Sequence, residues 1–152
     1  MEKSKLGISV SLLGAAVCFS GIMGAFAING GLTAYILPVL LIAYVLIAED
    51  NLWLRRTAAK AGVILFSFFM LSVFVELIPL LFGFIESLLN LFDESILGEK
   101  AIDIIARKIP NFFNSALIIA EIVLFLILGI KALGKKTLII APVDKMLNKH
   151  LN

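Results

Sequence analysis

Charged residues are scarce in this sequence. Lys, Arg, Asp and Glu make up 16% of the 152 residues, whereas they make up about a quarter of a typical globular domain. Hydrophobic residues make up 61% of the chain, and most of them lie in long uninterrupted runs. This number of charged residues is too small to cover the surface of a soluble domain. The composition therefore predicts that much of the surface faces lipid. The first expected partner is therefore the lipid bilayer.

Cysteine and histidine are nearly absent, with one residue of each. Cys18 has no second cysteine for an intramolecular disulfide, and no base beside it would activate its thiol. His150 is close to the C-terminus, where we expect a solvated side chain. A metal site needs several converging ligands, and the chain has no phosphate loop, nucleophile elbow or nucleic-acid-binding motif. These absences predict a protein that is not an enzyme and that binds no cofactor, metal ion or nucleic acid.

Four long apolar runs are present instead. A membrane-spanning helix needs about 20 apolar residues, and the runs predict spans at about 6–28, 32–48, 61–83 and 112–133. We therefore expect an all-α, polytopic membrane protein whose four transmembrane helices form a single membrane domain, 1–152.

Small residues characterise the first run. They recur at alternating spacings of four and three residues, which is a heptad pattern: Gly7, Ser11, Gly14, Cys18, Gly21 and Ala25. Small residues at this period let a second helix approach closely in lipid. The alternative is a secretory signal peptide, since Ala25-Phe26-Ala27 has the small-x-small form of a cleavage site. The apolar run is longer than that of a typical signal, so we expect a retained span with a helix-packing seam.

Polar segments separate and follow the runs. The linker 49–60 contains an aromatic residue and three basic residues that predict a cytoplasmic anchor: Trp53, Arg55, Arg56 and Lys60. In the expected exterior segment 84–111, Ile102, Ile105 and Ile109 recur at helical spacing and predict a short amphipathic helix. The tail 134–152 predicts a C-terminal helix that lies in the membrane interface.

The basic residues are unevenly distributed. With four spans, ten of the 13 Lys and Arg residues lie on the side that holds both termini and the linker 49–60. Cytoplasmic loops carry an excess of Lys and Arg. The sequence thus predicts a multi-pass protein of the inner membrane, with both termini in the cytoplasm.

Two carboxylic acids, Glu76 and Glu121, lie well inside the apolar runs. Counted from the outer ends of their runs, both are roughly 10–14 Å deep, so they could face each other. Intramembrane carboxylates often serve function, and two at one depth could share a proton or bind a cation. The structural alternative is that each is protonated and hydrogen-bonds a backbone carbonyl or a hydroxyl group, such as that of Ser72, Tyr35 or Tyr44.

Three short stretches resemble a known family. They are Trp-Leu-Arg-Arg-Thr-Ala-Ala-Lys-Ala at 53–61, Gly-Ile-Lys-Ala-Leu-Gly-Lys-Lys at 129–136 and Ile-Ala-Pro-Val-Asp-Lys-Met-Leu at 140–147. Their order resembles the small bacterial four-helix membrane proteins related to the chloroplast import component Tic-twenty. The best-placed matches are Gly134, Lys135, Pro142 and Lys145. Many family members have His and Gln in the first linker, where this chain has Arg56 and Lys60. The resemblance implies a four-helix architecture, and most bacterial members have no assigned activity.

Two functions remain open from the sequence. The first is an accessory or self-assembling helix-bundle subunit of a membrane complex, with a second copy or another membrane protein as partner. The second is a small oligomeric channel, or a proton- or cation-coupled transporter, that uses Glu76 and Glu121.

Overall fold

The computed structural model describes residues 3–26, 32–91, 104–136 and 145. Over these residues the protein is all-helical, as predicted. The α-helices are α1 (Val10–Ala25), α3 (Ile36–Ala48), α4 (Leu52–Leu91) and α6 (Ile109–Leu133), with a 3-10 turn η1 (Leu32–Tyr35) and a π-helical turn η2 (Ile104–Lys108).

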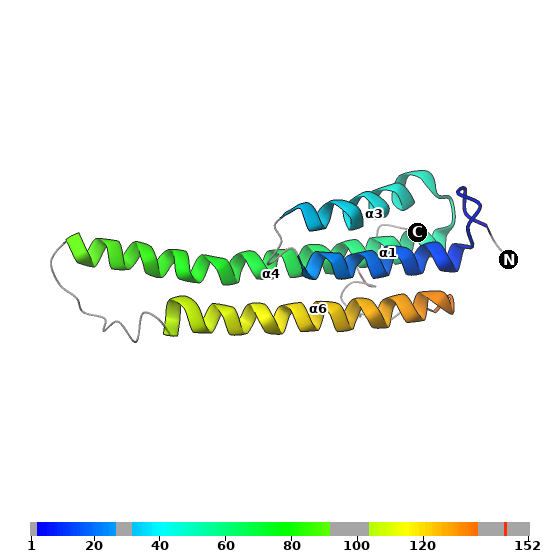
Figure 1. The fold of residues 1–152 in the computed structure, drawn as a ribbon. Coiled ribbons are helices and arrows are strands. Elements are labelled where there is room, and N and C mark those ends of the chain that lie inside the picture. Colours follow the sequence, from blue (N-terminus) through cyan, green and yellow to red (C-terminus); the bar gives the residue numbers. More distant parts are fainter. Residues whose placement is uncertain (1–2, 27–31, 92–103, 137–144, 146–152) are drawn as a thin grey trace.

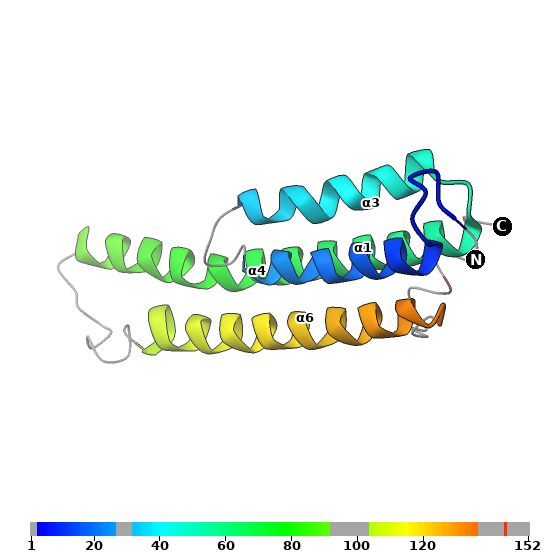
Figure 2. The ribbon, with the colours of Figure 1, turned by 45° about the vertical axis from the view of Figure 1, so that its right-hand side comes forward.

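The helices form an elongated bundle built along α4 (Figures 1 and 2). Helix α6 runs beside α4 in the opposite direction, and η2 leads directly into it. Helices α1 and α3 lie only along the first half of α4, and the N-terminal segment, the α3–α4 connection and the end of α6 share one end of the bundle (Figure 1). Among the described elements, only α6 and η2 accompany the second half of α4.

The helix ends follow from local hydrogen bonds. Ser9 caps α1, since its hydroxyl oxygen accepts from the Leu12 N–H at 3.2 Å. The Asn51 side-chain oxygen accepts from the Leu54 N–H at 3.1 Å at the start of α4, so both helices begin at a residue type that satisfies free N–H groups.

Helix α6 ends in a Schellman turn. The Lys136 N–H donates to the Lys131 carbonyl at 2.9 Å, and the Lys135 N–H donates to the Ala132 carbonyl at 3.0 Å. Lys135 has φ 53°, the left-handed conformation that this turn requires.

The observed helix bounds differ from the predicted ones at several points. The first helix begins at Val10 rather than at residue 6, because Gly7 has φ +76° and lies in a turn before the helix. The expected polar linker 49–60 is helical from Leu52 onward. Three apolar side chains at helical spacing explain this extension, since Leu54, Ala58 and Ala61 are almost completely buried in the bundle.

The expected exterior segment 84–111 is also partly helical. Its first residues continue α4 as far as Leu91, and its last residues form η2 and the start of α6. The amphipathic helix predicted around Ile102 falls partly on residues 92–103, which lie outside the described part of the chain. Almost all of the expected tail helix, within 134–152, also lies outside the described residues.

Two described helices are long and apolar enough to cross a membrane: Leu52–Ile85 and Ile109–Leu133. Only 17% and 28% of their most apolar windows are buried in the bundle, whereas the core helix of a soluble protein is mostly buried. Helices α1 and α3 have 16 and 13 residues, fewer than the roughly 20 that a bilayer requires. The described part of the chain therefore contains two helices that are long and apolar enough to span a membrane, and it does not show the four spans that the sequence predicted.

Reciprocal contacts between glycine and phenylalanine join α1 to α6. A Cβ atom on Gly21 would clash with the ring of Phe125, and one on Gly129 would clash with the ring of Phe19. Phe125 is fully buried. Each aromatic ring thus occupies the space that the missing side chain leaves on the opposite helix, and the two backbones come close together.

Candidate functional site

Glu121 lies at the centre of the bundle. It is 0% exposed, and among the described residues neither carboxyl oxygen has a hydrogen-bond partner. Such burial is costly for a carboxylate unless another group compensates its charge. An unpartnered buried acid is the most unusual chemical feature of the described bundle, and it defines the candidate site.

Three elements enclose this carboxyl group. The position that a Cβ on Gly24 would take lies 3.0 Å from Glu121 Oε1, 2.6 Å from Leu65 Cδ1 and 3.1 Å from Tyr35 Cε1. The absence of a side chain at Gly24 on α1 therefore makes room for groups from η1, α4 and α6. Sequence analysis did not foresee this role of Gly24, because nothing in the α1 pattern identifies the residues opposite it.

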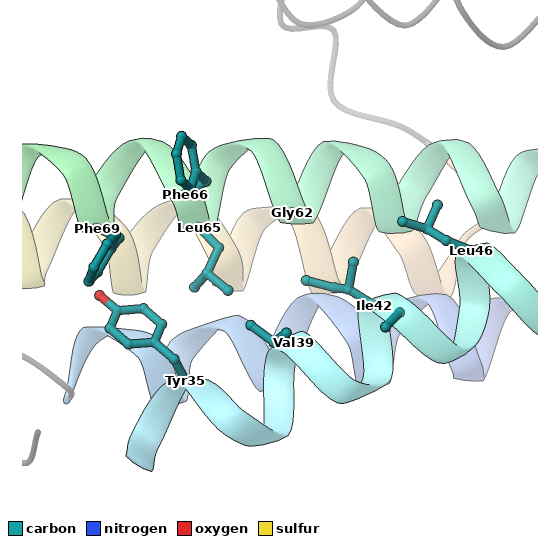
Figure 3. A pocket seen from close by; sticks show the side chains of 9 residues that line it. Tyr35, Val39, Ile42, Leu46, Gly62, Leu65, Phe66 and Phe69 are labelled. Carbon is teal, nitrogen blue, oxygen red and sulfur yellow. The ribbon is translucent and has the colours of Figure 1, made fainter. Parts of the chain in front are cut away.

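An apolar cavity of about 450 Å³, open on its outer side, lies beside this group, between α3 and α4. Tyr35 and Leu65 line it, so the same two side chains contact the space around Glu121 and the cavity. Figure 3 shows Tyr35 and Phe69 at one end of the cavity and Leu46 at the other. The rings of Tyr35 and Phe69 meet edge to face, with centroids 5.4 Å apart, a favourable aromatic arrangement.

Glu76 has a different environment from Glu121. Its side chain is exposed on the second half of α4, and α4 residues next to it along the helix, such as Leu77 and Leu80, are also exposed. Because Gly24 lies opposite both Leu65 and Glu121, Glu121 is level with Leu65. Glu76 is eleven residues farther along α4, or roughly 16 Å of helix.

This offset differs from the equal depth that the sequence predicted. At the end of the bundle away from the N-terminus, α4 extends beyond the start of α6 (Figure 1). Depths counted from the ends of the two apolar runs therefore do not start from the same level.

Two of the three hydroxyl groups expected to satisfy the acids, those of Ser72 and Tyr44, have other partners. Ser72 donates to the Phe69 carbonyl at 2.9 Å, and Tyr44 donates to Glu49 Oε1 at 3.3 Å. The structural alternative for Glu121, a hydrogen bond to one of these groups, does not occur within the described residues.

Most of the predicted seam lies inside the bundle. Gly14, Cys18, Gly21 and Ala25 are buried, Ser11 is partly buried, and Gly7 is exposed outside the helix. Gly14 lies against the Trp53 ring, with carbon atoms 3.0 Å from its Cβ position, and Gly21 lies against Phe125. The buried part of the seam therefore contacts both α4 and α6.

The predicted anchor residues lie on the first three turns of α4. Trp53 packs on α1 at Gly14, Lys60 is only 6% exposed, and Arg55 and Arg56 are partly buried. Trp53 and Lys60 therefore contribute to packing inside the bundle, in addition to the anchoring role that the sequence predicted for them.

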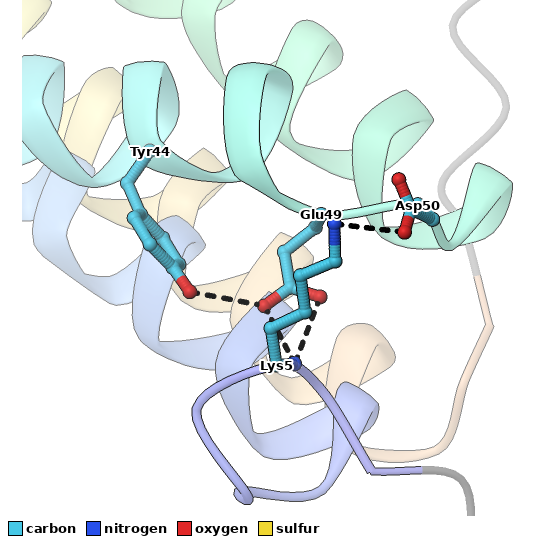
Figure 4. Close-up of polar contacts among 4 residues, drawn as sticks. All are labelled: Lys5, Tyr44, Glu49 and Asp50. Atoms are coloured by element: carbon cyan, nitrogen blue, oxygen red, sulfur yellow. Dashed lines mark hydrogen bonds and ion pairs between the residues drawn. The ribbon is translucent and has the colours of Figure 1, made fainter.

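Glu49 organises the end of the bundle near the N-terminus, a role that sequence analysis missed. It is 4% exposed, and its two carboxyl oxygens accept from the Lys5 backbone N–H at 3.0 and 3.2 Å. Lys5 Nζ also pairs with Asp50 Oδ2 at 2.8 Å (Figure 4). Lys5 and Glu49 are 44 positions apart in the chain, so no local pattern could have paired them.

Charge pairing sets the titration of the exposed ion pair. The Asp50 carboxylate raises the pKa of the Lys5 ammonium group, and Lys5 lowers the pKa of Asp50, in each case chiefly through their hydrogen bond. This pair holds the N-terminal segment against the α3–α4 connection.

The described residues contain no cluster of three or more side chains that could ligate a metal ion. The chemistry of the site therefore rests on one buried acid, one tyrosine and an apolar cavity. Comparison of the chain with protein-family models, curated proteins and solved structures finds no match.

Proposed function

We propose that this chain is a non-enzymatic integral membrane protein that acts by association, as an accessory or self-assembling helix-bundle subunit of a membrane complex. The observation that carries the proposal is Glu76, a carboxylic acid on the exposed apolar half of α4. Acids within membrane-spanning helices almost always face a protein interior or a water-filled cavity. The described chain does not bury Glu76, so a second copy or another membrane protein is the group expected to cover it.

The surface around Glu76 supports the same proposal. Exposed aromatic and aliphatic side chains continue along the second half of α4 and the first half of α6: Phe74, Leu80, Leu81, Phe84, Phe112, Phe113 and Ile119. Large aromatic side chains are enriched at the centres of protein interfaces. The region left open by α1 and α3 is therefore the expected docking face.

Cross-linking tests the association. In a Cys18→Ser background, Leu80→Cys places a thiol on the open face, and Ala61→Cys is a matched control in the packed part of the same helix. We expect a thiol-reactive cross-linker in native membranes to join Leu80→Cys to a partner, identified by mass spectrometry, and Glu76→Leu to lower the yield. Monomer alone at Leu80→Cys would contradict the proposal.

We further propose an inner-membrane location with both termini in the cytoplasm. The ten-to-three split of basic residues supports it, as does the grouping of the N-terminal segment, the α3–α4 connection and the end of α6 at one end of the bundle (Figure 1). In the Cys18→Ser background, an impermeant thiol reagent applied from outside should label Ser87→Cys and leave Lys136→Cys unlabelled. The reverse pattern would overturn the orientation.

A second candidate function is a small oligomeric channel or a proton- or cation-coupled transporter, and Glu121 is the observation that favours it. A fully buried acid with no described partner is suited to binding a proton or a cation. Flux into proteoliposomes tests this candidate. Transport that requires Glu121 should be lost in Glu121→Gln, whereas a purely associative subunit should give no flux in either form.

A further inference from the structure

The cavity between α3 and α4 has an unusual lining. The described side chains that line it are carbon-rich, and three of them carry aromatic rings: Tyr35, Phe66 and Phe69. Its volume, about 450 Å³, falls in the range of small-molecule sites. Aromatic faces carry negative potential and attract organic cations, so the lining is compatible with a bulky apolar ligand that bears a positive charge.

A carboxyl group lies directly behind one wall of this cavity. Tyr35 and Leu65 form that wall. Each has a carbon atom within 3.1 Å of the position that a Cβ on Gly24 would take, and Glu121 Oε1 lies 3.0 Å from the same position. Glu121 is completely buried and has no hydrogen-bond partner in the described residues. Charges interact strongly across such apolar surroundings, so a cation in the cavity would supply the compensating charge that Glu121 lacks.

We propose that the cavity between α3 and α4 binds a lipophilic organic cation, with Tyr35, Phe66 and Phe69 contacting its apolar body and Glu121 balancing its charge. This proposal does not depend on the association proposed above, because the cavity and the acid belong to a single chain. Under the transport candidate, it would name the class of substrate.

Other occupants fit the cavity less well. A hydrated metal ion needs several oxygen ligands, and the lining side chains offer one oxygen-bearing group, the Tyr35 hydroxyl. A lipid acyl chain matches the apolar lining but leaves Glu121 uncompensated. The acid and the aromatic rings together favour a charged apolar molecule.

A pair of probes with the same shape and opposite charge tests the proposal. Tetraphenylphosphonium and tetraphenylborate are added separately to the purified full-length protein in detergent, and binding is measured by equilibrium dialysis. We expect the phosphonium to bind at least roughly tenfold more tightly than the borate. Equal binding of the two ions would overturn the charge argument and indicate a site for uncharged apolar groups such as acyl chains.

Three variants assign the binding to this site. Glu121→Gln keeps the side-chain shape and should lower phosphonium affinity by roughly tenfold or more. Asp50→Asn removes a different carboxylate, at the opposite end of α3, and should leave affinity unchanged. Ala43→Phe fills the cavity from α3 without contacting Glu121 and should abolish binding.

Circular dichroism and size-exclusion chromatography establish that each variant is folded. Wild-type affinity in folded Glu121→Gln would overturn the role of the acid. Wild-type affinity in folded Ala43→Phe would overturn the location, and this test decides the proposal even where Glu121→Gln does not fold.

Discussion

The two halves of α4 belong to one continuous helix and have similar apolar composition, yet they are packed differently. In the first half, Leu54, Ala58 and Ala61 are at most 1% exposed. In the second half, Phe74, Leu80 and Phe84 are more than 60% exposed. The difference arises because α1 and α3 are short and lie beside the first half of α4 only (Figure 2). The neighbouring helices thus explain why these buried residues lie in the first half of α4, although the two halves are similar in composition.

The same division separates the two acids. Glu121 lies in the packed half, where α1, η1 and α4 enclose it, and Glu76 lies in the open half. One acid is therefore a candidate for ligand binding within a chain, and the other is a candidate for contact between chains.

The largest difference in stability between the two halves is expected when a phenylalanine in each half is replaced by alanine. Phe125 is 0% exposed and Phe74 is 66% exposed. Phe125→Ala leaves a cavity between α1 and α6 and should lower the free energy of unfolding by about 3–5 kcal/mol. Phe74→Ala removes an exposed ring and should change it by less than about 0.5 kcal/mol. Thermal unfolding in detergent measures both, and equal losses would show that the open half is packed in the isolated protein.

Replacing a glycine by leucine in each half provides a second comparison of stability. Gly21→Leu forces a side chain into the ring of Phe125 and should destabilise the bundle by about 1–3 kcal/mol through overpacking. At Gly83 nothing lies within 4 Å of the Cβ position, so Gly83→Leu should not destabilise the protein and should gain from the better helix propensity of leucine. Unchanged stability in Gly21→Leu would mean that the two helices separate at this point without cost.

A smaller effect is expected at the end of the packed half. Glu49→Ala removes the acceptor for the Lys5 N–H and the Tyr44 hydroxyl, and should lower the free energy of unfolding by about 1 kcal/mol. Hydrogen exchange of the Lys5 amide should accelerate, because that hydrogen bond is lost. An unchanged exchange rate would show that Glu49 does not hold the N-terminal segment in solution.

The smallest effect concerns the exposed pair of Lys5 and Asp50. Because the pKa of Asp50 is lowered in the folded protein, its contribution is present above the unfolded value of about 3.9 and is lost as pH falls further. Because the pKa of Lys5 is raised, its contribution is present below about 10.4 and is lost as pH rises through the folded value.

The difference in Tm between wild type and Asp50→Asn should therefore be constant from about pH 6 to 9 and shrink at both extremes. It should also shrink as salt concentration rises, since exposed charges are screened. A difference that shrinks neither at the extremes of pH nor with added salt would indicate that Asp50 acts through something other than its charge.

The sequence by itself determined the helical class, the two long apolar helices, and most of the small-residue face of α1. Each of these depends on patterns within about 25 consecutive residues: apolar length for α4 and α6, and three-four spacing for Gly14, Cys18 and Gly21. Local periodicity records which residues share one face of a helix, so these features could be predicted without knowledge of the neighbours.

Tertiary structure alone decided which acid is buried, which residues enclose it, and where α4 begins. Glu76 and Glu121 look alike in their apolar runs, but Gly24, Tyr35 and Leu65 come together around Glu121 from three distant parts of the chain. The register of α1 and α3 along α4 sets this grouping, as it sets the pairing of Lys5 with Glu49. Register depends on how side chains from different helices fit together, and a single sequence carries no direct record of that fit.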